Sequence, residues 1–104
     1  MEELNLDSEL LEPMKLRLEK TIDTLTKNAL ATGKESEINL KIKIGITERY
    51  DEKTGKDWIE PEIEYQITDK IKEDKGTYKQ SLGFNYEIEL DEENKVIIKN
   101  KEEN

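Results

Sequence analysis

The sequence predicts an α+β fold in which one N-terminal amphipathic helix packs on a four-stranded antiparallel meander sheet. Two observations lead to this prediction. Apolar residues in the first third of the chain recur at the three-to-four-residue spacing of a helix face, and later apolar residues alternate with polar ones as on a half-buried strand. A helix with one apolar stripe and a sheet with one apolar face bury both by packing together.

The helix is expected over about residues 9–30. Its apolar stripe lies within about 80° of arc at 100° per residue and comprises Met14, Leu18, Ile22, Leu25 and Ala29. Gly33 is expected just beyond its end, in the left-handed conformation that closes many helices.

The start of the helix has two solutions. It begins at Asp7 or Ser8, with Pro13 distorting an early turn, or it begins near Glu12, with Pro13 in the first turn where its missing N–H costs nothing. In either case residues 1–8 are expected to be frayed.

Four strands are expected, at about residues 37–50, 57–71, 77–90 and 95–99, followed by a charged tail at 100–104. Pro61 indicates an edge position or a bulge, and Gly83 a bulge or bend. If the first two strands form a hairpin, paired residue numbers sum to 105 or 107, which places Lys41 and Lys43 opposite Glu62, Glu64 or Gln66. The core is expected to join the helix stripe to Leu40, Ile42, Ile44, Ile63, Tyr65, Phe84 and Ile88.

Length and composition limit the function. The 104 residues predict a single domain over 1–104, with 41% charged residues and a formal charge of −9. Such a field favours cationic partners and disfavours direct DNA binding. The chain has no Cys and no His, and no apolar run approaches a membrane span. We therefore expect a cytoplasmic protein of a host cell, with no membrane association and no cofactor.

The sequence offers little support for catalysis. Glu60, Glu62 and Glu64 alternate on one strand face about 6.6 Å apart, but the open face of a meander provides no cleft to shift their pKa values. The acidic stretch 91–94 lacks the spacing of a calcium loop, and the glycines never cluster into a phosphate loop. We expect no enzymatic activity and no metal site.

The strongest functional signal is the only Trp, which shares a strand face with three carboxylates. Two interpretations of Trp58 remain open. It covers the aliphatic stem of Arg49 or Lys56, or it anchors an interface. Leu16 and Ile97 also fall off the buried faces, which favours a homo-oligomer such as a dimer. The expected protein-binding residues are Trp58, Glu60, Glu62, Glu64, Glu87 and Glu89.

The order of elements resembles a family of small phage and prophage proteins commonly labelled "replication terminator protein". The corresponding stretches are residues 18–25 (LEKTIDTL), 38–44 (INLKIKI) and 62–68 (EIEYQIT), and the likeness spans about residues 14–99. This chain has Ala-Thr-Gly-Lys at 31–34 where the family has Asp-Pro-Asn-Thr. The resemblance implies a phage protein and carries no catalytic residue.

Three functional hypotheses follow. The first is a non-enzymatic, phage-type interaction protein whose acidic surface inhibits a basic or nucleic-acid-binding host protein, such as a defence nuclease, in the manner of an anti-CRISPR protein. The second is a dimeric sponge that sequesters a signalling nucleotide through Lys41, Lys43, Arg49 and Tyr50. The third is a structural or replication-associated phage protein.

Overall fold

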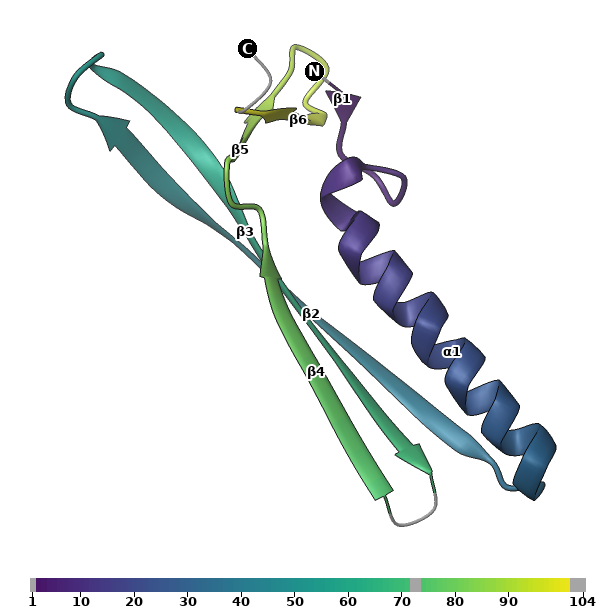
Figure 1. The fold of residues 1–104 in the computed structure, drawn as a ribbon. Helices are drawn as coiled ribbons and strands as arrows, with labels where there is room; N and C mark the ends of the chain where they lie inside the picture. Colours follow the sequence, from purple (N-terminus) through teal and green to yellow (C-terminus); the bar gives the residue numbers. More distant parts are fainter. Residues whose placement is uncertain (1, 72–73, 102–104) are drawn as a thin grey trace.

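The computed structural model describes residues 2–71 and 74–101. Figure 1 shows a long, narrow sheet, a helix running beside it and a small sheet near both termini. In chain order the elements are β1 (Glu2–Glu3), the 3-10 turn η1 (Glu9–Leu11), α1 (Glu12–Thr32), β2 (Ser36–Asp51), β3 (Lys56–Ile71), β4 (Asp74–Leu82), β5 (Tyr86–Leu90) and β6 (Val96–Asn100).

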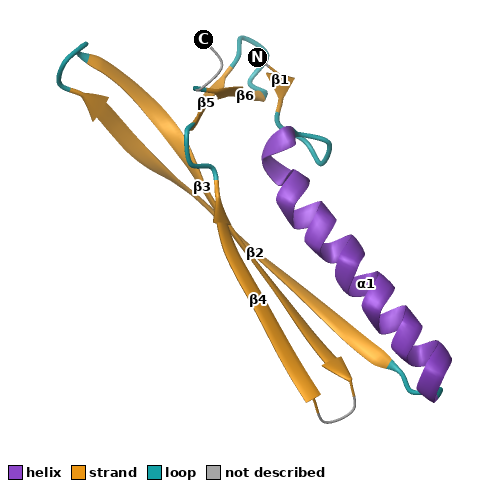
Figure 2. Ribbon diagram, in the orientation of Figure 1, coloured by secondary structure: helices purple, strands orange, loops and turns teal. Residues whose placement is uncertain are grey.

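The predicted α+β class, with one N-terminal helix and antiparallel strands, is confirmed, but the single four-stranded sheet is wrong. The described strands form two three-stranded sheets, in the orders β2-β3-β4 and β1-β6-β5. Figure 2 shows these two sheets as separate groups of strands. The third predicted strand, at 77–90, is therefore divided between them.

The division occurs at Gly83. This residue has φ +98° and Asn85 has φ +68°, so the backbone turns sharply between β4 and β5. A Cβ atom at Gly83 would overlap the carbonyl oxygen of Pro61. Glycine thus permits both the positive φ and the close approach to β3. A bend was predicted here, whereas a change of sheet was not.

The β2–β3 hairpin carries an uninterrupted antiparallel register, from Ser36 opposite Ile71 to Asp51 opposite Lys56. Paired numbers sum to 107, and Lys43 faces Glu64 as predicted. Pro61 lies within this register without a bulge. Because β4 pairs with β3 only from Ile63 onward, Pro61 occupies a stretch of β3 that β4 does not reach, which is the predicted edge position.

The helix start follows the second of the two solutions. The 3-10 turn η1 precedes α1, which begins at Glu12 with Pro13 in its first turn. Gly33 ends α1 at φ +72°, and its N–H donates to the Ala29 carbonyl at 2.7 Å. Pro13 fits the first turn because an N–H there has no partner within the helix, and Gly33 fits the helix end because glycine tolerates positive φ.

The prediction that residues 1–8 are frayed is wrong over 2–8. Strand β1 pairs with β6, and Ser8 is buried, with its Oγ accepting the Asn5 N–H at 2.9 Å. No local pattern in residues 2–8 indicated that so short a strand would pair with the edge of β6. In the predicted tail, Asn100 completes β6, while residues 102–104 lie outside the described residues.

The core lies along one side of β3, in two clusters of buried residues. One joins Leu10, Ile63 and Ile98, and the other joins Met14, Tyr65 and Ile67, with Leu18, Ile38, Tyr78 and Leu82 packed against it. Tyr65 donates its hydroxyl to Gln80 Oε1 at 2.7 Å, and burial raises its pKa to about 12. The guanidinium carbon of Arg17 lies 3.7 Å from the centre of the Tyr78 ring.

Several predicted core residues are instead exposed. Their exposed fractions are 39% for Leu40, 42% for Ile42, 79% for Ile44, 75% for Phe84 and 49% for Ile22. The 21 residues of α1 span about 31 Å, whereas the 16 residues of β2 span about 53 Å. The two core clusters gather on β3 and β4, with only Ile38 from β2 packed against them, so most of the apolar row of β2 is left uncovered, both beside the helix and beyond its end. Phe84 is exposed because it follows the turn at Gly83.

Candidate functional site

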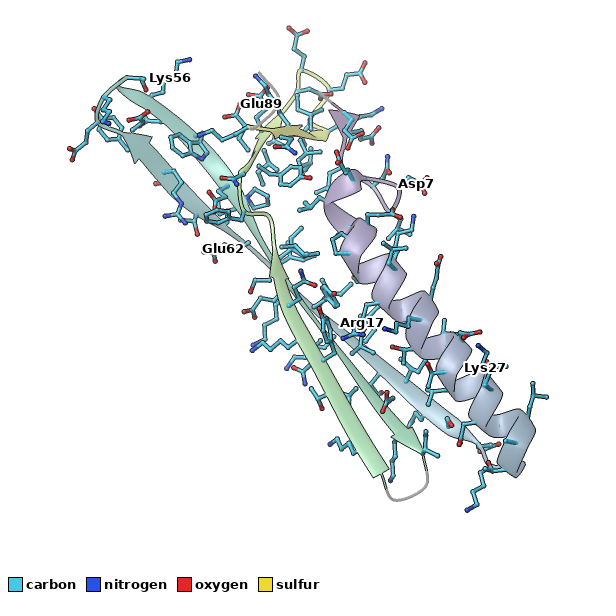
Figure 3. The ribbon with its side chains drawn as sticks, in the orientation of Figure 1. Asp7, Arg17, Lys27, Lys56, Glu62 and Glu89 are labelled. Atoms are coloured by element: carbon cyan, nitrogen blue, oxygen red, sulfur yellow. The ribbon has the colours of Figure 1, made fainter. Side chains whose placement is uncertain are left out.

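A groove of about 650 Å³ lies between the distal end of the β2–β3 hairpin and β5. Figure 3 shows Lys56 at the hairpin tip and Glu89 on the neighbouring small sheet. The groove exists because β4 ends at Leu82 and β5 leaves the plane of the long sheet, so residues 56–62 of β3 face the small sheet. Its lining residues are Glu48, Arg49, Tyr50, Asp57, Trp58, Ile59, Glu87, Ile88 and Glu89.

Trp58 separates this groove from a second one of about 370 Å³, to which Lys99 and Lys101 contribute. The Nζ of Lys101 lies 2.9 Å from the centre of the indole ring. The cation over the ring of Trp58 is therefore Lys101, which the hairpin interpretation did not include, while Arg49 lies opposite Trp58 in the register and lines the first groove. Trp58 is half-buried, and its Nε1 is buried without a hydrogen-bond acceptor among the described residues.

The carboxylates of β3 are individually held by neighbouring side chains. Glu60 accepts a hydrogen bond from Arg49 at 3.3 Å, and its side chain is only 12% exposed. Glu62 accepts the hydroxyl of Thr47, and Glu64 accepts that of Ser81 at 3.3 Å. These contacts stabilise the outer face of the hairpin and reduce the charge it offers to a partner.

The predicted protein-binding residues thus fall into two groups. Trp58, Glu87 and Glu89 come together in the 650 Å³ groove. Glu60, Glu62 and Glu64 instead line a smaller hollow of about 530 Å³ beside Phe84. The predicted nucleotide-binding residues are also divided, because Arg49 and Tyr50 line the groove while Lys41 and Lys43 are exposed further along β2.

Sequence reasoning assigned no binding role to Glu48, Asp57 or Lys101, and it placed Ile88 in the core. Glu48 and Asp57 carried a usable signal, since the register places them opposite Ile59 and Tyr50. The positions of Ile88 and Lys101 depend on the small sheet lying beside the hairpin. A prediction that continued the third strand through Gly83 could not place them there.

The groove is strongly acidic. Glu48, Asp57, Glu87 and Glu89 line it, and its one cation, Arg49, is already paired with Glu60. Across residues 2–71 and 74–101, no three acidic side chains converge in a way that would hold a metal ion. Carboxylates arranged around the ring of Trp58 attract cationic groups, such as lysine and arginine side chains.

Comparisons with protein-family models, with curated proteins and with solved structures found no match for this chain. In the described part of the chain, no helix is long and apolar enough to cross a membrane.

Proposed function

We propose that this chain is a non-enzymatic interaction protein whose acidic groove binds basic side chains of a partner protein. The observation that carries the proposal is the Lys101 ammonium on the face of Trp58, beside a groove lined by four carboxylates. An ammonium over an indole ring gains about 0.5–1 kcal/mol at an exposed site and more where water is excluded. Lys101 itself lines the second groove, on the other side of Trp58, so its contact demonstrates cation binding by the indole ring at the border of the acidic groove.

The partner class follows from charge. A chain of net charge −9 attracts basic surfaces, and proteins that bind nucleic acid carry such surfaces. Occupying a nucleic-acid channel with carboxylates would block it. The phage-type inhibitor of a host nuclease is our specific proposal for this class, and the resemblance of the sequence bears only on its phage character.

The nucleotide-sponge alternative has less support. Arg49 and Tyr50 do line the groove, but the four carboxylates around them repel phosphate, and Lys41 and Lys43 lie elsewhere on β2. The proposed role as a structural or replication-associated phage protein has no feature of the groove in its favour.

The only Trp makes a direct test possible. Titration with a hexalysine peptide should change the fluorescence of Trp58, because the peptide's ammonium groups enter the groove beside the indole, while hexaglutamate should give no change. Reversing two groove charges, Glu87→Lys with Glu89→Lys, should weaken hexalysine binding at least about tenfold, as expected for close charge pairs.

A matched control separates the groove from net charge. The pair Glu19→Lys with Asp23→Lys makes the same charge change on exposed α1 residues and should retain most of the affinity. Equal losses in the two double variants would show that hexalysine responds to overall charge alone and would overturn the groove assignment. Tight binding of a cyclic dinucleotide in place of the peptide would favour the sponge.

A further inference from the structure

The outer strand of the long sheet, β2, has a second feature that is distinct from the acidic groove. Strand β2 is an outer strand, and among the described strands none pairs with its free edge. Its 16 residues run without a bulge and without Pro. Natural proteins usually protect so long an edge with a bulge, a proline, charged side chains or a covering segment, because its free N–H and C=O groups attract another strand. Of these devices, β2 has only charged side chains, among them Lys41 and Lys43.

Among the described residues, the same strand also carries a row of exposed apolar side chains. Leu40, Ile42, Ile44 and Ile46 share one face and are 39%, 42%, 79% and 58% exposed. Ile38, nearest to the helix, is half-buried against the core. The Cα radius of gyration is 17.8 Å, whereas a compact chain of this length has about 13 Å. The extended arm is what lengthens the molecule, as Figure 1 shows.

We propose that the free edge of β2 pairs with the β2 edge of a second copy, forming a two-fold symmetric dimer with a continuous six-stranded sheet. Charge identifies the occupant. In a chain of net charge −9, β2 is neutral, because Glu37, Glu48 and Asp51 balance Lys41, Lys43 and Arg49. A second acidic copy can approach this strand, whereas a basic partner is drawn to the groove instead.

The residue pattern also fixes the register. Antiparallel pairing that keeps both apolar rows on one face requires paired numbers with an even sum. A sum of 88 pairs residues 37–51 of each copy and places Ile44 at the two-fold axis, with Ile42 facing Ile46 of the other copy. Lys43 then faces Gly45, so no lysines oppose each other in the centre, and the like charges that do oppose, Glu37 and Asp51, fall at the two ends of the pairing. A sum of 82 would place Lys41 opposite Lys41 of the other copy, and a sum of 86 would do the same for Lys43. A sum of 84 would place Lys41 opposite Lys43, so all three registers oppose like charges.

This register also gives exposed apolar residues lateral neighbours. At its start, β2 lies near α1, as Figure 1 shows, and the pairing brings the distal end of the other copy's hairpin to that level, where Tyr50 faces Ile38. Tyr50 is 61% exposed in one copy, and in the dimer it gains Ile38 of the other copy as an apolar neighbour.

Sedimentation velocity and light scattering test the proposal. The wild-type protein should have twice the 12.2 kDa mass of the chain. Ile44→Lys should raise the dimer dissociation constant at least about tenfold, because it places two like charges at the axis. Its far-ultraviolet circular dichroism should be unchanged, since the side chain is largely exposed. The control Leu6→Lys, at a residue 71% exposed outside β2, should remain dimeric. A monomeric wild type, or an Ile44→Lys variant that remains a dimer, would overturn the proposal.

Single cysteines test the register in a chain that has none. Residues opposed at an antiparallel axis have Cα atoms about 4.5–5.5 Å apart, within the range of a disulfide. Ile44→Cys should therefore form a covalent dimer on oxidation, and Leu40→Cys, which faces Glu48, should not. Cross-linking through Leu40→Cys alone would overturn the sum of 88.

Discussion

At the scale of single residues, Gly83 determines more of this structure than any other. Its positive φ ends β4 and sends the chain into the small sheet, and its missing side chain lets Pro61 approach. The acidic groove exists because of this turn. A Cβ at this position would push the Pro61 carbonyl away, and that movement is resisted because Pro61 is held in the β2–β3 pairing.

Gly83→Ala should lower the free energy of unfolding by about 2 kcal/mol or more, since it combines positive-φ strain with an overlap. Gly55→Ala is the matched control, because Gly55 also has positive φ (71°) but open space around it. It should cost about 1 kcal/mol. Urea unfolding of both variants measures the difference, and equal losses would mean that the contact with Pro61 does not constrain the fold.

At the scale of elements, the sequence predicted what depends on local pattern. The alternation of apolar and polar residues located the strands. The apolar residues have even numbers in β2 and odd numbers in β3, and with a six-residue loop this limited the sum of paired residue numbers to 105 or 107, of which 107 is observed. Gly33 marked the helix end because few other residues adopt positive φ there. The two-residue β1 could not be predicted in this way, because it is stabilised by pairing with β6, which lies far away in the sequence.

The packing of α1 on the long sheet leads to a stability prediction. Leu25 is 6% exposed, whereas Leu30, on the same helix, is 84% exposed. Leu25→Ala should cost about 2–5 kcal/mol through lost burial and a residual cavity, and Leu30→Ala less than about 0.5 kcal/mol. Thermal and urea unfolding compare them. A loss at Leu25 no larger than that at Leu30 would mean that the C-terminal half of α1 does not pack as described.

At the scale of the whole molecule, the candidate site was predicted only in part. Alternation identified Trp58 and the acidic residues as facing away from the core. The groove itself joins β3 to β5, elements that a single meander would have placed in one plane. The bare apolar row has another cause, because the buried clusters gather on β3 and β4 rather than on β2, and alternation alone does not tell which strands the helix covers.

The two proposed surfaces should respond to salt in opposite directions. Binding of hexalysine to the groove is an attraction between unlike charges, so screening weakens it. Dimerisation through β2 joins two chains of net charge −9 over apolar, neutral strands, so screening removes repulsion and strengthens it. Raising NaCl from about 0.05 to about 0.5 M shortens the Debye length from about 14 to about 4 Å.

Over this range the hexalysine dissociation constant, measured by Trp58 fluorescence, should rise about tenfold or more. The dimer dissociation constant, measured by sedimentation in the same buffers, should fall. The Glu87→Lys with Glu89→Lys variant serves as the control, because it should lose most of the salt response of peptide binding while its dimerisation keeps the wild-type direction. If salt weakened both equilibria, charge attraction would join the two copies as well, and the neutrality of β2 could not be the reason for their pairing.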